Sequence, residues 1–226
     1  MQVIITSKTH MLNSSCVGAI AANGRFLRLL DENGYNQSTD TNFEVRQLWD
    51  IEFTNRIDLT PPHVEDVLVH SKEFKGLIKD EISILEIIER FNTPIWRGSS
   101  DVLFDGKIQW TNSGSGYISE DGGIPSNSVG FWLSDKDLIR RDFNNKVRYS
   151  YPIKWRNISF VGFQHPVAVI PAKTLIRVSL ARWWSPSYDE ERCYLQLSGW
   201  YDLKPPNNAA SIQSVNCNDP DDSLPF

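Results

Sequence analysis

The sequence is poor in the residues that build metal centres and disulfide frameworks. It has three cysteines among 226 residues, Cys16, Cys193 and Cys217, and it has no C-x-x-C pair. A structural zinc site needs closely spaced thiolates and a disulfide framework needs an even set, so neither is expected. No metal-binding spacing is found among the four histidines, which are His10, His63, His70 and His165.

The signatures of common enzymes are also missing. There is no G-x-x-x-x-G-K-[ST] phosphate loop, no G-x-G-x-x-G fingerprint, no H-E-x-x-H helix and no G-x-S-x-G turn. Glu120 and Asp121 stand beside a Gly-Gly pair, where adjacent acids are usually solvated. We therefore predict no enzyme, no cofactor and no metal. A small enzyme assembled from residues distant in the sequence remains an alternative.

Long apolar runs are absent, as is a large excess of one charge. No apolar segment approaches the ~18 residues that span a bilayer, and the first residues lack the regions of a signal peptide. A soluble, cytoplasmic protein is expected. The net charge is −5, and three acids, Asp219, Asp221 and Asp222, lie near the C-terminus. The near-neutral remainder argues against strong duplex-DNA binding but leaves room for a local basic groove.

The first half of the sequence contains a series of short apolar segments, which Gly, Asn, Asp and Pro divide. Asn23-Gly24 lies between two of them and predicts a hairpin, because both residues tolerate positive φ. A helix is predicted over 80–91, with Asp80 as its cap and apolar residues at helical spacing. Asp105-Gly106 predicts a second hairpin over 102–110. Strands are expected over 1–8, 16–20, 25–30, 48–54 and 65–69.

The second half has the same strand-like pattern after one polar segment. Residues 111–128 are rich in Gly, Ser and Asn, which predicts a mobile loop or a domain junction. The strands beyond it are numerous and short enough for a small barrel. They are expected over 129–133, 147–151, 158–164, 175–184 and 192–201. From residue 204 on, small polar residues and prolines indicate a flexible linker.

Three groups of residues carry a family resemblance. They are Cys16–Ala19 with Arg28–Leu30, Leu48–Phe53 with Pro61–Leu68, and Arg177–Trp184 with Arg192–Tyr201. By these stretches the chain resembles the dual-OB domain family of bacterial anti-phage conflict systems, over roughly residues 1–203. The resemblance implies two OB-like barrels and a nucleic-acid-linked role beside helicases or other effectors. OB folds also bind sugars and proteins, so the fold alone does not decide the ligand.

The expected fold class is therefore mainly β, with two OB-like small barrels, one short helix and a disordered acidic C-terminal tail. The first barrel is placed at residues 1–115 and includes the helix. The second is placed at 116–203, and the linker and tail at 204–226.

Basic and aromatic residues alternate in two parts of the second half. OB folds that hold single strands stack bases on aromatic rings and pair phosphates with Arg or Lys. Neighbouring residues on a strand face opposite sides, so one of Trp183 and Trp184 should be core and the other exposed. Trp200 and Tyr201 pose the same choice. The alternative is a solvated hairpin over core aromatics. The predicted nucleic-acid contacts are Arg140, Arg141, Lys146, Arg148, Tyr149, Lys154, Trp155, Arg177, Arg182, Trp183 and Trp184.

The C-terminal residues resemble the tip of bacterial single-stranded DNA-binding protein (SSB), which is acidic and then ends in an aliphatic residue, Pro and Phe. A terminal Phe presents a ring and an α-carboxylate that a partner pocket with Arg or Lys can hold together. An acidic tail without a partner is the alternative. The residues predicted to dock a partner are Asp219, Asp221, Asp222, Leu224, Pro225 and Phe226.

Two binding hypotheses follow from these features. In the first, the chain binds single-stranded DNA or RNA in a defence or DNA-processing system, and its tail docks an SSB-interacting helicase or nuclease. In the second, the chain is a protein-interaction adaptor or SSB-tail mimic that recruits or blocks such a partner without binding nucleic acid.

Overall fold

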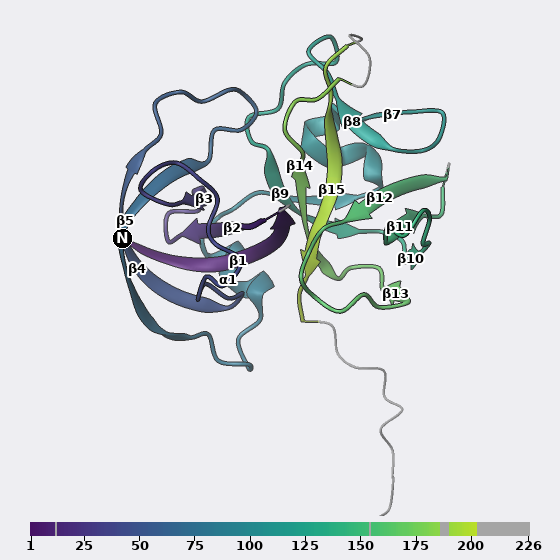
Figure 1. Cartoon of the computed structure of the whole chain (residues 1–226). Coiled ribbons are helices and arrows are strands. Elements are labelled where there is room, and N and C mark those ends of the chain that lie inside the picture. Colours follow the sequence, from purple (N-terminus) through teal and green to yellow (C-terminus); the bar gives the residue numbers. More distant parts are fainter. Residues whose placement is uncertain (12, 154, 186–189, 203–226) are drawn as a thin grey trace, which may run out of the picture.

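The computed structural model describes residues 1–11, 13–153, 155–185 and 190–202. Strands dominate, which confirms the mainly β fold class. Figure 1 shows two β units side by side, with the N-terminal unit at the left and the later strands at the right. Residues 204–226, on which the linker and tail predictions rest, lie outside the described residues. Within the described residues, no helix is long and apolar enough to cross a membrane.

The first unit is a closed barrel whose five strands follow the order β1-β2-β3-β5-β4. All neighbours are antiparallel except β3 and β5, which are parallel. The predicted Asn23-Gly24 hairpin is confirmed between β2 and β3, and Gly24 has φ +80°. The strands are β1 (Gln2–Met11), β2 (Ser14–Ala21), β3 (Phe26–Leu30), β4 (Gln47–Asn55) and β5 (Asp66–Leu77).

The second sheet repeats this strand order. Its path is β13-β10-β11-β12-β15-β14-β9-β6, and β12 pairs with β15 in parallel as β3 does with β5. Only three residues separate β9 from β10, which lie one strand in from the two ends of the path, so the two act as halves of one bent strand. The strands are β6 (Ile95–Gly98), β9 (Val129–Ser134), β10 (Leu138–Arg140), β11 (Arg148–Tyr151), β12 (Arg156–Phe160), β13 (Val169–Ile170), β14 (Leu175–Leu180) and β15 (Cys193–Trp200). We call this sheet the second barrel.

Two sequence predictions between the barrels are corrected. The hairpin over 102–110 is a 3₁₀ helix, η1 (Ser100–Gly106), because Phe104 turns left-handed and buries its ring against Trp96. The polar segment 111–128 is not only loop, since β8 (Gly116–Ile118) is buried and pairs with both β15 and β7 (Gln109–Trp110). Strand pairing thus joins β6, β7 and β8 to the second sheet. The domain boundary at residue 115 remains a prediction.

The helix α1 (Ile84–Arg90) is shorter than predicted and is capped from elsewhere in the chain. Asp80 is exposed and lies outside it. Ser83 is the N-cap, and its Oγ accepts a hydrogen bond from the Leu85 amide. A second acceptor is Asp202, whose Oδ2 takes hydrogen bonds from Ser83 Oγ and the Ile84 amide, both at 2.9 Å. The carboxylate therefore satisfies a helix donor from 118 residues away and lies at a favourable dipole end.

Replacing Asp202 with alanine is expected to lower the free energy of unfolding by ~1–2 kcal/mol, the range of a lost helix cap. The change also removes the ion pair of Asp202 Oδ1 with Arg46 Nη1, at 3.1 Å. Urea unfolding followed by tryptophan fluorescence measures the loss. Asp80→Ala is the matched control and should leave stability near that of the wild type, because Asp80 caps nothing.

An apolar seam joins the two barrels. The outer side of β1, β2 and β3 packs on α1 and on β9 and β14 of the second barrel, and Tyr201 donates a hydrogen bond to Thr6 O across the seam. OB folds commonly hold oligonucleotides on the surface of their second and third strands. In the first barrel this surface is covered by protein. The seam residues are Ile4, Ile20, Phe26, Ile84, Ile88, Phe131, Leu133, Leu175 and Tyr201.

Candidate nucleic-acid interface

The corresponding surface of the second barrel is open on β11, β12 and β15. Burial alternates along β15, where Tyr194 and Gln196 are half-buried between buried neighbours. Strand register aligns Arg148 with Ser159 and Ser159 with Gln196, so one polar row crosses the three strands. Tyr194 lies two residues before Gln196 and is paired with Tyr117 of β8. This polar row and its two flanking loops form the candidate interface.

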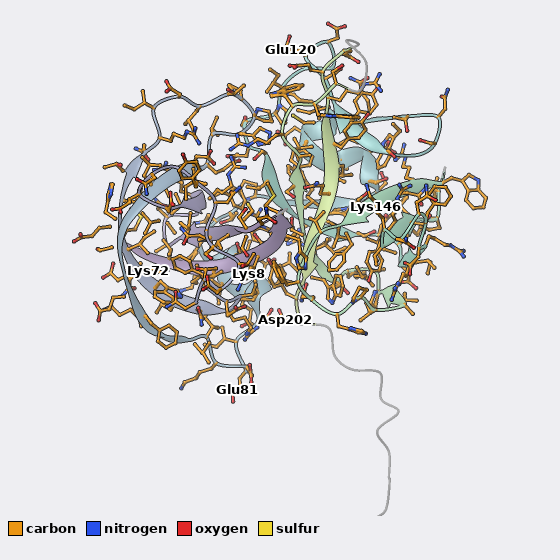
Figure 2. The ribbon with its side chains drawn as sticks, in the orientation of Figure 1. Lys8, Lys72, Glu81, Glu120, Lys146 and Asp202 are labelled. Carbon is orange, nitrogen blue, oxygen red and sulfur yellow. The ribbon has the colours of Figure 1, made fainter. Side chains whose placement is uncertain are left out.

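The loop between β10 and β11, residues 141–147, carries the basic side of the interface. Arg141 and Lys146 are exposed, and Figure 2 shows Lys146 over the strands of the second barrel. Phe143 is 59% exposed, and the Arg148 guanidinium lies 5.4 Å from its ring centroid. Asn144 and Asn145 both have positive φ, which closes this loop in a tight turn. A cation–aromatic pair beside exposed cations suits stacking and phosphate contact.

An aromatic cluster lies where the connection between β14 and β15 meets β8. Trp184 is 55% exposed, and its ring centroid is 6.1 Å from that of Tyr194. Tyr194 is in turn 6.1 Å from Tyr117, and the Arg192 guanidinium lies 4.2 Å from the Tyr117 centroid. Beside them is an open pocket of about 490 Å³ whose lining includes Trp110. Tyr117 is buried and Tyr194 half-buried, so Trp184 is the ring of this cluster that is free to stack a nucleobase. Arg192 is ion-paired with Glu190, with 3.3 Å between Nε and Oε2.

Several predicted contact residues remain accessible, although not all are free. Arg141, Lys146, Trp155 and Trp184 are exposed, and Trp155 is 81% exposed between β11 and β12. Arg140 is paired with Asp142, with 2.7 Å between Nη2 and Oδ2, so its charge is largely compensated locally. Lys154 falls outside the described residues.

Other predicted contacts are corrected by their burial. Tyr149 is fully buried, and its hydroxyl donates to Val167 O. Arg177 is 1% exposed and lies in the seam beneath the first barrel. Neither can contact a ligand on the interface. Both Trp200 and Tyr201 are buried, against the expected split, because β15 runs into the seam at its C-terminal end.

Trp183 and Arg182 attach the connection between β14 and β15 to the first barrel. Trp183 is partly buried and donates its indole N–H to Pro61 O at 2.7 Å, whereas Trp184 is exposed, as the alternation of strand residues predicts. Arg182 Nη2 donates to Asp66 Oδ2 at 2.8 Å. These two bonds fix the connection to the first barrel and present Trp184 outward.

Sequence reasoning missed Tyr117, Phe143, Arg192 and Tyr194. Phe143 lies inside the basic stretch, and an aromatic residue beside two asparagines was the signal that could have marked it. Tyr117 and Tyr194 are 77 positions apart and meet only through strand register, which a single sequence does not display.

The charged cluster around Asp66, under the seam, has the features of a structural cluster and not of a catalytic one. Asp66, 1% exposed, contacts Arg28, Arg182 Nη2 at 2.8 Å and Arg56 Nη1 at 3.7 Å. Burial, with the charges of Arg28 and Arg182, lowers the pKa of nearby His63 to about 3. Burial raises the pKa of the Cys193 thiol, 3.7 Å from His63 Nε2, to about 12. An activated Cys–His pair needs the opposite shifts.

Metal binding has no support in the part of the chain that the structure describes. No group of three or more His, Cys, Asp or Glu side chains gathers there in a way that could hold an ion.

Comparison with known proteins gives one match. A family model described as a dual OB-containing domain matches residues 1–200, which is most of the chain. No curated protein and no solved structure matches the sequence or the fold.

Proposed function

Because the chain belongs to the dual OB-containing domain family, we propose that it binds single-stranded nucleic acid without catalysis, across the candidate interface of its second barrel. OB-fold domains are in general binding modules for nucleic acids or proteins. The observation that carries the proposal is the combination of the exposed cations Arg141 and Lys146 with the exposed rings of Phe143 and Trp184 on the two loops that flank β11, β12 and β15.

The geometry supports a strand that runs from one loop to the other. Lys146 and Arg148 would contact phosphates at the loop between β10 and β11, and Phe143 would stack a base there. Farther along, Trp184 and Tyr194 would stack further bases beside Arg192. The polar row between them offers hydrogen-bonding groups without apolar bulk. Binding through phosphate contacts and base stacking tolerates different nucleotide sequences, because every base has a π-face.

The tail extends this proposal to a partner. Asp219, Asp221 and Asp222 would meet a basic rim, and Phe226 would enter a pocket that normally receives the SSB tip. The docking needs Phe226 to carry the free α-carboxylate. We place the activity in a bacterial defence or DNA-processing system, with a helicase or nuclease as the docked protein.

A protein-binding role is the second candidate, and the net charge of −5 favours it. Acidic proteins repel nucleic acid at long range, so binding rests on the local cations alone. In this case the exposed rings of Trp184 and Phe143 would contact an effector protein, since aromatic residues are enriched in protein interfaces.

Fluorescence polarisation with a labelled single-stranded oligonucleotide, over a salt series, tests the proposal. Each lost phosphate contact should reduce the slope of log K against log salt by about 0.7 for a single strand. Lys146→Gln combined with Arg148→Gln should therefore reduce it by about 1.4. Lys72→Gln is the control, because Lys72 lies on the side of the first barrel away from the second barrel in Figure 2. It should leave the slope unchanged.

The outcomes distinguish the two candidate functions, and they test the docking role of the tail separately. If the wild type fails to bind at low salt, the nucleic-acid proposal is rejected and the protein-binding role takes its place. A chain shortened before Asp219 should still bind the oligonucleotide. The full chain, and not one extended by a glycine after Phe226, should bind a helicase or nuclease that reads the SSB tip.

A further inference from the structure

A small cavity with polar groups in its lining lies in the seam between the barrels, apart from the candidate interface. Its volume is about 30 Å³. Its lining is rich in hydroxyl groups and contains two arginines and one carboxylate, which come from both barrels. The polar lining residues are Ser7, Thr9, Arg28, Glu65, Ser128, Arg177, Ser179 and Ser198.

Arg177 is a buried cation without a matching acceptor. It is 1% exposed, and its Nε and Nη1 have no hydrogen-bond partner among the described residues. Its guanidinium lies 5.1 Å from the Phe26 ring centroid and 5.3 Å from that of Phe131, which supply only a weak negative potential. An unpaired buried charge is strongly disfavoured, and an arginine does not lose its proton to escape the cost.

The nearby carboxylates do not complete its hydrogen bonds. Glu65 accepts from the Ser128 amide at 2.6 Å and from Ser128 Oγ at 2.8 Å. Asp66 is shared among Arg28, Arg56 and Arg182, and Arg28 Nη2 is left without a partner among the residues that the structure describes.

Positive charge is in excess in the lining of the cavity, which holds two guanidinium groups, Arg28 and Arg177, and one carboxylate, Glu65. Arg56 and Arg182, which also contact Asp66, are 39% and 48% exposed and are partly solvated. The low pKa of buried His63 is consistent with this positive field, since Arg28 and Arg182 contribute to it. A neutral water molecule can accept hydrogen bonds but cannot balance the charge.

We propose that this cavity binds a halide-sized anion, with chloride as the natural occupant. The anion would be held by Arg177 Nε and Nη1, Arg28 Nη2 and the surrounding hydroxyl groups. A volume of about 30 Å³ suits an ion close to a water molecule in size. Because Arg28 belongs to the first barrel and Arg177 to the second, the bound ion would stabilise one orientation of the two barrels.

Crystals of the chain grown in sodium bromide provide the direct test. Bromide scatters anomalously and replaces chloride in such sites. We expect an anomalous peak in the cavity, within contact distance of the Arg177 guanidinium. Ordinary water density without an anomalous peak would overturn the proposal, and it would identify the occupant as water.

Thermal unfolding gives an independent measurement on the full chain. The wild type should unfold at a higher temperature in chloride than in gluconate of the same ionic strength, because a ligand of the folded state stabilises it. Ser179→Val places a methyl group in the cavity and should abolish the difference. Ser159→Val is the control, since it makes the same change on β12 outside the cavity, and it should keep the wild-type difference. Equal unfolding temperatures of the wild type in both salts would contradict the proposal.

Discussion

Replacing Asp66 with alanine is expected to lower the free energy of unfolding by ~3–5 kcal/mol, the range for breaking a buried ion pair. Asp66 is 1% exposed and is the common partner of Arg28, Arg56 and Arg182. Arg182 belongs to the segment between β14 and β15, and the other two arginines belong to the first barrel. The substitution would leave buried positive charge uncompensated and would weaken the contact between the barrels.

A matched control separates this effect from the loss of any carboxylate. Asp142→Ala removes an aspartate whose ion pair with Arg140 lies at the exposed surface, and we expect stability near that of the wild type. Chemical denaturation monitored by circular dichroism measures both variants. Similar stability of Asp66→Ala and Asp142→Ala would show that the buried cluster is not a main source of stability.

Acid should also destabilise the protein through this cluster, in two pH windows. Burial alone would raise the pKa of Asp66, but hydrogen bonds and charge from Arg28 and Arg182 outweigh it and hold the pKa below its ordinary value. Its stabilising effect is thus present above about pH 4 and is lost as the pH falls further. His63 acts earlier. Its pKa is about 3 in the folded chain, against about 6.5 unfolded, so stability should already decline as the pH falls below about 6.5.

Replacing Trp184 with alanine is expected to weaken binding of single-stranded oligonucleotide about 5- to 150-fold, since one base–aromatic stack contributes ~1–3 kcal/mol. Trp184 is the most exposed member of the aromatic cluster, and hydrogen bonds from Trp183 and Arg182 hold its segment against the first barrel. Stability should change little because the ring is 55% exposed.

Tyr35→Ala is the matched control for this measurement. Tyr35 is an exposed aromatic residue of the first barrel, at 72% exposure, and it lies outside the candidate interface. Binding by this variant should equal that of the wild type. Equal affinity of the Trp184→Ala and Tyr35→Ala variants would remove the aromatic cluster from the interface. Trp184→Phe should recover most of the affinity, which a purely structural role for the indole would not explain.

Local patterns in the sequence predicted most strands of the two barrels. Alternation of apolar and polar residues placed β4, and Asn23-Gly24 placed the turn between β2 and β3, because each signal acts over a few neighbouring residues. The strand pattern of the second half predicted a second small barrel, and the family resemblance agreed with it. The predictions that failed were overridden by tertiary contacts. Ser83, supported by the distant Asp202, caps α1 in place of Asp80, and Phe104 packs on Trp96 instead of taking part in a hairpin.

The candidate site was predicted less completely than the fold. Composition located the basic stretch around Lys146 and the exposed Trp184, but it could not distinguish them from Tyr149 and Arg177, which have the same chemistry and are buried. Burial depends on which strand surface the other barrel covers. That choice is made by contacts between residues more than 100 positions apart, such as the hydrogen bond from Tyr201 to Thr6.

By itself the sequence determined the β-rich class, the turn positions, the family and the local concentration of cations and rings. Only the tertiary structure decided which OB surface stays open, which rings gather beside Arg192, and where positive charge is left in excess under the seam. The physical reason is that strand propensity and turn chemistry are local properties. Burial and charge compensation are instead properties of the assembled chain, because both depend on residues that folding brings together from distant segments.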